Sequence, residues 1–153
     1  MGFGEPIRFK QFADLPYGAE RVFDLVADVE RYPEFLTEYR KVHIRSRDGE
    51  TLQVDQIIGF SAIELTLSAV ATLKRPESIV VRSHHGLMGD LEIRWNFKPS
   101  KMGTYVEFRM ELMPPSRFAA GLVGYLLTKS AERTIRAFTE RAHRVYGDVS
   151  LSP

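Results

Sequence analysis

The residues best suited to bind a metal ion or to transfer protons are the four histidines, and their spacing argues against both uses. They are His43, His84, His85 and His143. His84 and His85 are adjacent in a strand-like segment, so their side chains point to opposite faces and cannot hold one metal ion together. The sequence has no His-x-x-x-His pair, no nucleophile elbow and no phosphate-binding glycine loop. We therefore predict no catalytic residue and no metal site, and we expect that the protein is not an enzyme.

Two polar residues, Gln56 and Ser83, fall at positions where the strand pattern places apolar side chains. A buried amide or hydroxyl without a hydrogen-bond partner costs about 1–3 kcal/mol. The partner of each could be a ligand carbonyl, a backbone group or a water molecule. A strand bulge could also turn either residue outward, and the sequence leaves these alternatives open.

The composition is that of a globular domain. The 153 residues are 44% apolar and 27% charged, with a formal net charge of +1 and no cysteine, so disulfides and cysteine-ligated metals are excluded. We expect a single domain over residues 1–153, with its core in about 7–147. The chain shows no secretory signal and no run approaching about 18 apolar residues. We expect a cytoplasmic protein that touches membranes only peripherally, on their inner face.

Alternation of apolar and polar residues with period two predicts a series of strands. They are residues 7–12, 39–46, 51–59, 63–73, 79–84, 91–97 and 106–112. Apolar residues at helical spacing predict a short amphipathic helix over 19–28. Pro33 disfavours a helical Tyr32, so this helix should end there and a second short turn should begin.

One long amphipathic helix is predicted for the last third of the chain. Ser116 is a good N-cap, and no proline interrupts the segment from Arg117 to about Tyr146. Roughly 30 helical residues make a rod about 45 Å long. Gly121 and Gly124 lie inside it, and they either leave room for a ligand or allow close packing on the sheet.

These elements together predict an α+β fold in which a curved antiparallel sheet is wrapped around one long C-terminal helix. Such an arrangement can enclose an apolar cavity as well as a core. We expect a pocket of roughly 300–1,000 Å³, lined from both the sheet and the helix. The sequence therefore indicates binding of an apolar molecule.

Four groups of residues, in this order along the chain, are similar to one known family. They are Leu15-Pro16-Tyr17 with residues 22–36, Ile58-Gly59-Phe60, residues 86–91 with Trp95-Asn96-Phe97, and residues 137–142 with Tyr146-Gly147. Together they resemble the coenzyme Q-binding protein family of the START-like (polyketide cyclase/dehydrase) superfamily, over about residues 7–147. The resemblance implies the helix-grip fold, with two short helices after the first strand. It also implies an isoprenoid quinone as ligand, bound between sheet and helix in support of respiratory electron transport.

The resemblance leaves three functional hypotheses. The main one is a non-enzymatic binding protein or chaperone for a ubiquinone-like lipid, with no other cofactor. The first alternative is a relative of the ribosome-association toxins of this family, a regulator that binds the large ribosomal subunit through the basic residues of the long helix and of the strand around Arg40, Lys41, Arg45 and Arg47. The second alternative is a polyketide cyclase or aromatase. We expect no contact with DNA.

The predicted ligand contacts are inward strand positions, the apolar stripe of the long helix and the turn before the second strand. They are Phe35, Leu36, Gln56, Leu91, Trp95, Phe108, Leu122, Leu126 and Phe138. The predicted point of membrane contact is the apolar tip Leu87-Met88 between two glycines, helped by Arg117 and Phe118. The alternative for this tip is that it folds back onto the core of the protein.

Overall fold

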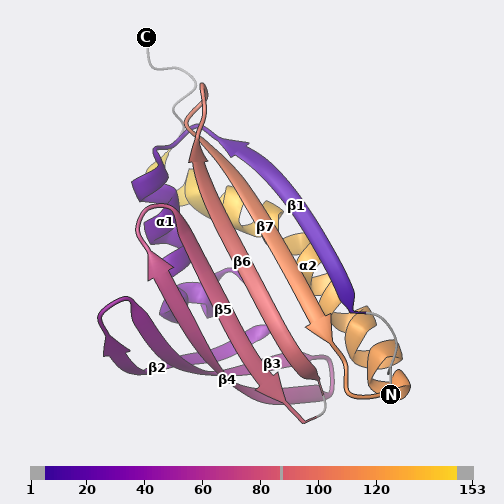
Figure 1. Cartoon of the computed structure of the whole chain (residues 1–153). Coiled ribbons are helices and arrows are strands. Elements are labelled where there is room, and N and C mark those ends of the chain that lie inside the picture. The colour runs from indigo at the N-terminus through magenta and orange to yellow at the C-terminus, as the bar shows by residue number, and fades with distance from the viewer. Residues whose placement is uncertain (1–5, 87, 148–153) are drawn as a thin grey trace.

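The computed structural model of the chain describes residues 6–86 and 88–147 and consists of one curved sheet, a long helix and two short ones (Figure 1). In chain order the elements are β1 (Ile7–Leu15), α1 (Ala19–Ala27), the 3-10 helix η1 (Val29–Glu34), β2 (Tyr39–Asp48), β3 (Thr51–Phe60), β4 (Ile63–Lys74), β5 (Ser78–His85), β6 (Gly89–Pro99), β7 (Thr104–Met113) and α2 (Arg117–Tyr146).

The seven described strands form one antiparallel sheet in the order β1-β7-β6-β5-β4-β3-β2. β1 lies at one edge beside β7, and α1 with η1 connects it to β2 at the opposite edge. Figure 1 shows α2 running behind the strands, across the concave side of the sheet. The predicted fold class, a curved antiparallel sheet with a long C-terminal helix and two short helices after the first strand, is confirmed.

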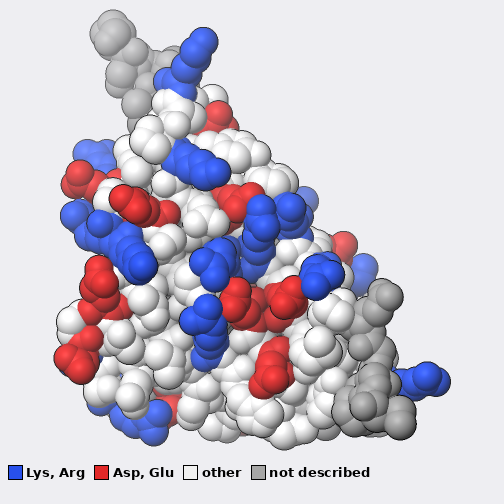
Figure 2. All heavy atoms as spheres, in the orientation of Figure 1, with Lys and Arg blue, Asp and Glu red and all other residues white. Residues whose placement is uncertain are grey.

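The period-two alternation separates the two faces of the sheet. On β6 and β7 the buried side chains include Trp95, Phe97 and Phe108, which lie on the face that the helices cover, where Trp95 packs against Phe138 of α2 and Phe97 against Phe23 of α1. The opposite face carries charged side chains of both signs, interspersed as Figure 2 shows. Many of these charges are paired, as in Arg8–Glu111 at 2.7 Å. Positive charge is therefore not concentrated on this outer face.

The ends of α2 are fixed as the sequence predicts. The Ser116 side chain accepts a hydrogen bond from the backbone N–H of Ala119 at 3.1 Å, which makes Ser116 the N-cap. At the other end the N–H of Gly147 donates to the carbonyl of His143 at 2.9 Å, with φ of +83° at Gly147. The predicted bounds of this helix are confirmed.

The face that α2 turns toward the sheet differs from the predicted one in the first half of the helix. The prediction placed Leu122 and Leu126 inward, but Leu122 is 41% exposed and Leu126 is only partly buried. The buried residues of α2 are Ala119, Val123, Gly124, Leu127, Ala131, Phe138 and Ala142. Most of them are small, because α2 lies close to the edge strand β1. A Cβ at Gly124 would stand 2.5 Å from Cδ1 of Ile7, so this glycine serves close packing on the sheet.

The tip between β5 and β6 corrects the membrane-contact prediction. Leu87 lies outside the described residues. Met88 is only 1% exposed and belongs to the main apolar core, so its side chain is not available to a membrane in this structure. The adjacent Gly89 has a φ of +90°, and a Cβ there would stand 1.9 Å from the carbonyl oxygen of Met113. This close approach folds Met88 back onto the protein, which is the alternative that the sequence left open.

Candidate ligand-binding site

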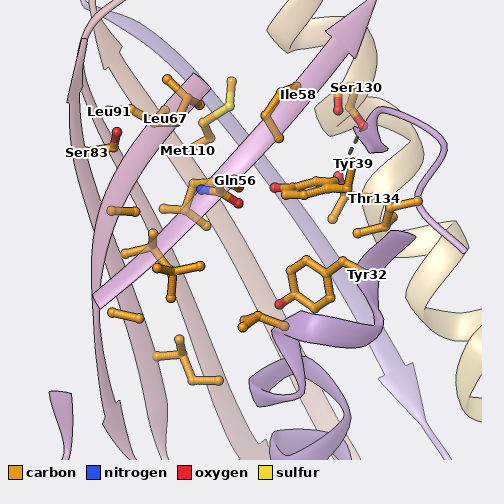
Figure 3. A pocket seen from close by; sticks show the side chains of 18 of the residues that line it. Tyr32, Tyr39, Gln56, Ile58, Leu67, Ser83, Leu91, Met110, Ser130 and Thr134 are labelled. Atoms are coloured by element: carbon orange, nitrogen blue, oxygen red, sulfur yellow. Dashed lines mark hydrogen bonds between the residues drawn. The ribbon is translucent and has the colours of Figure 1, made fainter. Parts of the chain in front are cut away.

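A cavity lies between the concave face of the sheet, the segment from η1 to β2, and α2. The space open to the centre of a water molecule is about 100 Å³. Side chains from β3, β4, β5, β6 and β7 form one wall, and Leu127, Ala131 and Phe138 of α2 form the other. Figure 3 shows side chains of the wall converging on one space. Most of them are apolar, so the interior suits an apolar molecule.

The cavity is narrower than the roughly 300–1,000 Å³ that we expected from the fold. Two tyrosines that the sequence prediction did not include, Tyr32 of η1 and Tyr39 at the start of β2, project into it (Figure 3). Their rings contact each other edge to face, with centroids 5.3 Å apart. These two rings occupy space that small residues such as Ala69 and Ala71 leave open on the opposite wall.

Six of the nine predicted ligand contacts line the cavity. They are Leu36, Gln56, Leu91, Trp95, Phe108 and Phe138. All except Leu36 and Phe138 come from strands, where period two fixes the inward side chains directly. The structure thus brings together the strand residues that the sequence predicted.

Three predicted contacts do not line the cavity. Leu122 and Leu126 lie on α2 about one position away from its inward face, as described above. The ring of Phe35 packs edge to face against Phe138 at 5.0 Å, and the Arg141 guanidinium lies 5.0 Å from the centre of the Phe35 ring. Phe35 therefore does not line the cavity itself but packs against Phe138, which does.

Besides Phe138, four helix residues line the cavity that the prediction missed, because most of them are small or polar. They are Leu127, Ser130, Ala131 and Thr134. Ala119, Val123, Leu127 and Ala131 recur at a spacing of four, which was the available signal. Tyr39 was missed because the period-two alternation places it on the same, outward face as Lys41. An irregularity in the β2–β3 register lies between these two residues and breaks that alternation.

Some polar side chains of the cavity wall have a hydrogen-bond partner within the protein, and others have none among the described residues. The Ser83 hydroxyl donates a hydrogen bond to the backbone carbonyl of Ser68 at 3.0 Å. Of the partners that the sequence left open for Ser83, the structure therefore has a backbone group. Tyr32 donates to the carbonyl of Val26, and Thr134 donates to the carbonyl of Ser130 at 3.1 Å. Gln56, by contrast, makes no side-chain hydrogen bond with any described residue.

The tyrosine hydroxyls inside the cavity remain protonated at any physiological pH. Burial raises the pKa of Tyr39 above its ordinary value, and the nearby charge of Glu38 raises it further. Burial is also the largest cause of the raised pKa of Tyr32, followed by Tyr39 and Asp28. Both groups are therefore hydrogen-bond donors rather than phenolates.

Two ion pairs connect α2 to the segment around η1, beside the cavity. The carboxylate of Glu38, which is 6% exposed, lies 3.4 Å from the Arg133 guanidinium. The Glu34 carboxylate lies 2.9 Å from Arg141. Hydrogen bonds from Arg141 and then Arg31 hold the pKa of Glu34 below its ordinary value. Glu38 borders both the cavity and the surface grooves beside α2, so the pair with Arg133 lies between the interior and the solvent.

Neither a metal centre nor a membrane span is found in residues 6–86 and 88–147. No group of three or more His, Cys, Asp or Glu side chains there is arranged to hold a metal ion. Within the same residues no helix combines the length and the apolar character needed to cross a bilayer.

Comparison with known proteins gives one family and two kinds of relative. The family described as polyketide cyclase / dehydrase and lipid transport matches residues 15–141. Ribosome association toxin RatA of Escherichia coli (strain K12) is 30% identical over 135 residues, which cover 86% of this chain and 84% of that protein. Coenzyme Q-binding protein COQ10 homolog B, mitochondrial, of Xenopus laevis is 22% identical over 146 residues, covering 92% of this chain and 60% of that protein.

Among solved structures, the Zhui aromatase/cyclase from Streptomyces sp. R1128 has the same fold. Its TM-score is 0.82 at 13% identity, and the match covers 92% of this chain and 95% of that one. This finding corrects the expectation that the protein is not an enzyme. An aromatase/cyclase shares this fold, so the lack of a familiar catalytic motif in the sequence does not separate a carrier from an enzyme.

Two phenylalanines of α2 lie on different faces of the helix, so replacing them by alanine should lower the free energy of unfolding by different amounts. Phe138→Ala should lower the free energy of unfolding by about 3–5 kcal/mol, because its ring is 3% exposed and packs 5.0 Å from the ring of Trp95. Phe118→Ala, at a position 76% exposed, should change it by less than about 0.5 kcal/mol. Urea unfolding of both variants is the measurement. Equal effects would mean that α2 presents another face to the sheet.

Proposed function

Because the chain belongs to the polyketide cyclase/dehydrase and lipid transport family, a START-like family, we propose that it binds an apolar, lipid-like molecule between its sheet and α2. The observation that supports this most strongly is the apolar-walled cavity itself, formed where a simple core could have been packed. Its walls come from six strands, from η1 and from α2. A ligand there would be enclosed by rigid elements on both sides.

The ligand proposed in more detail is an isoprenoid quinone, carried or sheltered in support of respiratory electron transport. The aromatic rings of Trp95, Phe108 and Phe138 give an apolar surface suited to a quinone ring. The similarity to a coenzyme Q-binding protein, over 92% of this chain, supports the same class of ligand. The ring would enter the cavity beside Tyr32 and Tyr39, and the tail would extend toward the surface.

Quinone binding should quench the fluorescence of Trp95, the only tryptophan, in a saturable way. Ala69 lies in the cavity wall, paired with Val54 and Ser83 of the two neighbouring strands. Ala69→Leu should abolish this quenching, because the larger side chain fills the remaining space of the cavity. The measurement is titration with a short-tailed ubiquinone, with mass spectrometry of lipid that co-purifies with the protein.

The matched control is Val70→Leu, which adds apolar volume at a position 45% exposed on the outer face of the same strand. It should bind quinone as the unmodified protein does. Retained quenching in a folded Ala69→Leu variant would place the quinone elsewhere and contradict the cavity as its site.

Loading such an insoluble ligand calls for transient contact with a bilayer, and we place this contact at the start of α2. Phe118, Leu122 and Tyr125 are exposed apolar residues of one helix segment, and Phe118 is the most exposed of them. Arg117 begins the segment, and the Lys129 ammonium lies 5.7 Å from the centre of the Tyr125 ring. Aromatic and apolar side chains flanked by cations suit the surface of an anionic membrane. Burying two of them contributes at most about 3–6 kcal/mol, before the costs of association.

The double variant Phe118→Asp with Leu122→Asp should lose binding to vesicles of phosphatidylglycerol and phosphatidylcholine. Its melting temperature should stay nearly unchanged, because both side chains are exposed. Vesicle co-sedimentation is the measurement. The control, Met102→Asp with Val70→Asp, alters two exposed apolar residues away from α2 and should bind vesicles normally. Vesicle binding by the folded α2 variant would rule out this segment as the contact.

Association with the ribosome is the second candidate function. It is favoured by the 30% identity with ribosome association toxin RatA and by cations on the exposed side of α2. Arg136 and Arg144 are exposed and make no ion pair with any described residue, unlike Arg133 and Arg141. They are free to contact phosphate groups of RNA.

If the ribosome is a partner, the protein should co-sediment with large ribosomal subunits. This binding should weaken steeply between about 50 and 200 mM salt, because each phosphate contact releases counterions when it forms. Arg136→Glu with Arg144→Glu should weaken the binding and lower its salt dependence by about one unit of slope per contact. Lys10→Glu with Lys98→Glu, at exposed strand positions, is the charge-matched control. Equal binding by both variants would exclude the α2 surface.

A further inference from the structure

Two polar side chains face the apolar cavity with their hydrogen-bonding capacity unused. The Gln56 carboxamide and the Tyr39 hydroxyl both line the cavity, and neither makes a hydrogen bond with any residue in 6–86 or 88–147. Of the other polar side chains of the wall, Tyr32, Ser83 and Thr134 each donate to a backbone carbonyl. An amide and a phenol kept in an apolar interior without partners are suited to pair with a bound molecule.

The sheet register places these two groups near each other. Tyr39 lies directly opposite Ile58 in the β2–β3 ladder, and Gln56 is two residues from Ile58 on the same face of β3. Such diagonal neighbours have Cα atoms about 7–8 Å apart, within reach of long side chains. In Figure 3 the hydroxyl of Tyr39 and the amide of Gln56 both point into the middle of the cavity. A single ligand group could therefore meet both.

The charge of the wall restricts what that ligand group can be. No Lys, Arg or His side chain is among the described residues that line the cavity, and the one ionisable acid there, Glu38, already has Arg133 at 3.4 Å. A carboxylate or phosphate would be buried beside Glu38 without a cation of its own, which is strongly unfavourable. A cationic group would have to compete with Arg133 for the same carboxylate.

We propose that Tyr39 and Gln56 together bind the oxygen of a neutral polar group, so that the ligand is an apolar molecule with a carbonyl or hydroxyl on its head rather than a hydrocarbon or an anionic lipid. The phenol of Tyr39 donates to a ligand oxygen, and the Gln56 amide donates to the same oxygen or accepts from a hydroxyl. The raised pKa of Tyr39 keeps its proton in place for this bond. This inference rests on the proposed binding of an apolar ligand in the cavity and names its chemical class.

The test compares three single variants by quenching of Trp95 with a short-tailed ubiquinone. Tyr39→Phe and Gln56→Met each remove one free polar group with little change of volume, and each should weaken quinone binding roughly tenfold, as the loss of one hydrogen bond requires. Gln53→Met is the matched control, because it makes the same change as Gln56→Met at an exposed position on the outer face of the same strand. It should leave quinone affinity unchanged.

Two competitors separate the ligand classes. Squalene, which has no oxygen, should bind the unmodified protein and both variants with equal affinity. Palmitate should not compete, because nothing in the wall pairs with its carboxylate. Quinone affinity that is unchanged in folded Tyr39→Phe and Gln56→Met variants would overturn the assignment of the polar group while leaving apolar binding intact. If neither quinone nor squalene binds the unmodified protein, the proposed function and this inference both fail.

A measurement on the unmodified protein removes any dependence on how the variants fold. The infrared carbonyl stretch of bound, isotope-labelled quinone should shift to lower frequency than that of the same quinone in a hydrocarbon solvent. This shift should disappear in whichever variant lacks the donor. A bound quinone whose carbonyl stretch equals the hydrocarbon value would overturn the proposal directly.

Discussion

The packing of Phe138 against aromatic rings from the sheet and from the η1 region joins the parts of this fold. Its ring lies 5.0 Å from Trp95, 5.4 Å from Tyr32 and 5.0 Å from Phe35. Aromatic contacts of this kind add about 0.5–1.5 kcal/mol each beyond the area they bury. Because Phe138, Trp95 and Tyr32 also line the cavity, the residues that hold α2 on the sheet are the residues a ligand would touch. The stability of the fold and the proposed ligand binding would therefore depend on one cluster.

The cavity exists because small side chains on both walls leave the concave side of the sheet incompletely filled. α2 approaches closely through Gly124 and Ala131, and the opposite wall contributes Ala69 and Ala71. Tyr32 and Tyr39 occupy part of the space that remains. The proteins similar to this chain include a coenzyme Q-binding protein and an aromatase/cyclase, so the activity depends on the side chains in that space rather than on the fold.

The distribution of charge differs between the outer face of the sheet and the exposed side of α2. Acidic and basic side chains on the outer face of the sheet alternate and pair, as in Arg82–Glu92 at 3.0 Å (Figure 2). On α2 the exposed aromatic residues of the first half and the exposed Arg136 and Arg144 of the second half lie along one helix. The same helix also forms a wall of the cavity.

The helices and strands, and the inward residues of the strands, can be predicted from the sequence because they follow from local rules. Ser116 fixes where α2 begins, and period-two alternation fixes that Trp95 and Phe108 face inward. A helix is different, since its apolar stripe is broad and α2 also has apolar residues outside it. Only the close approach of Gly124 to Ile7 decided that Leu127 and not Leu126 faces the sheet.

Tertiary structure alone also decided which polar groups are satisfied and which surfaces are open. Gln56 and Ser83 are equivalent in the sequence pattern, but Ser83 has the carbonyl of Ser68 within 3.0 Å, whereas Gln56 faces a cavity. The sequence predicts that Met88 lies at an exposed hairpin tip. In the structure the backbone at Gly89 packs closely against Met113, and the Met88 side chain is buried in the core. In each case the outcome depends on a neighbour distant in the chain, because a hydrogen-bond partner or a packing surface is supplied by another element and leaves no signal in local spacing.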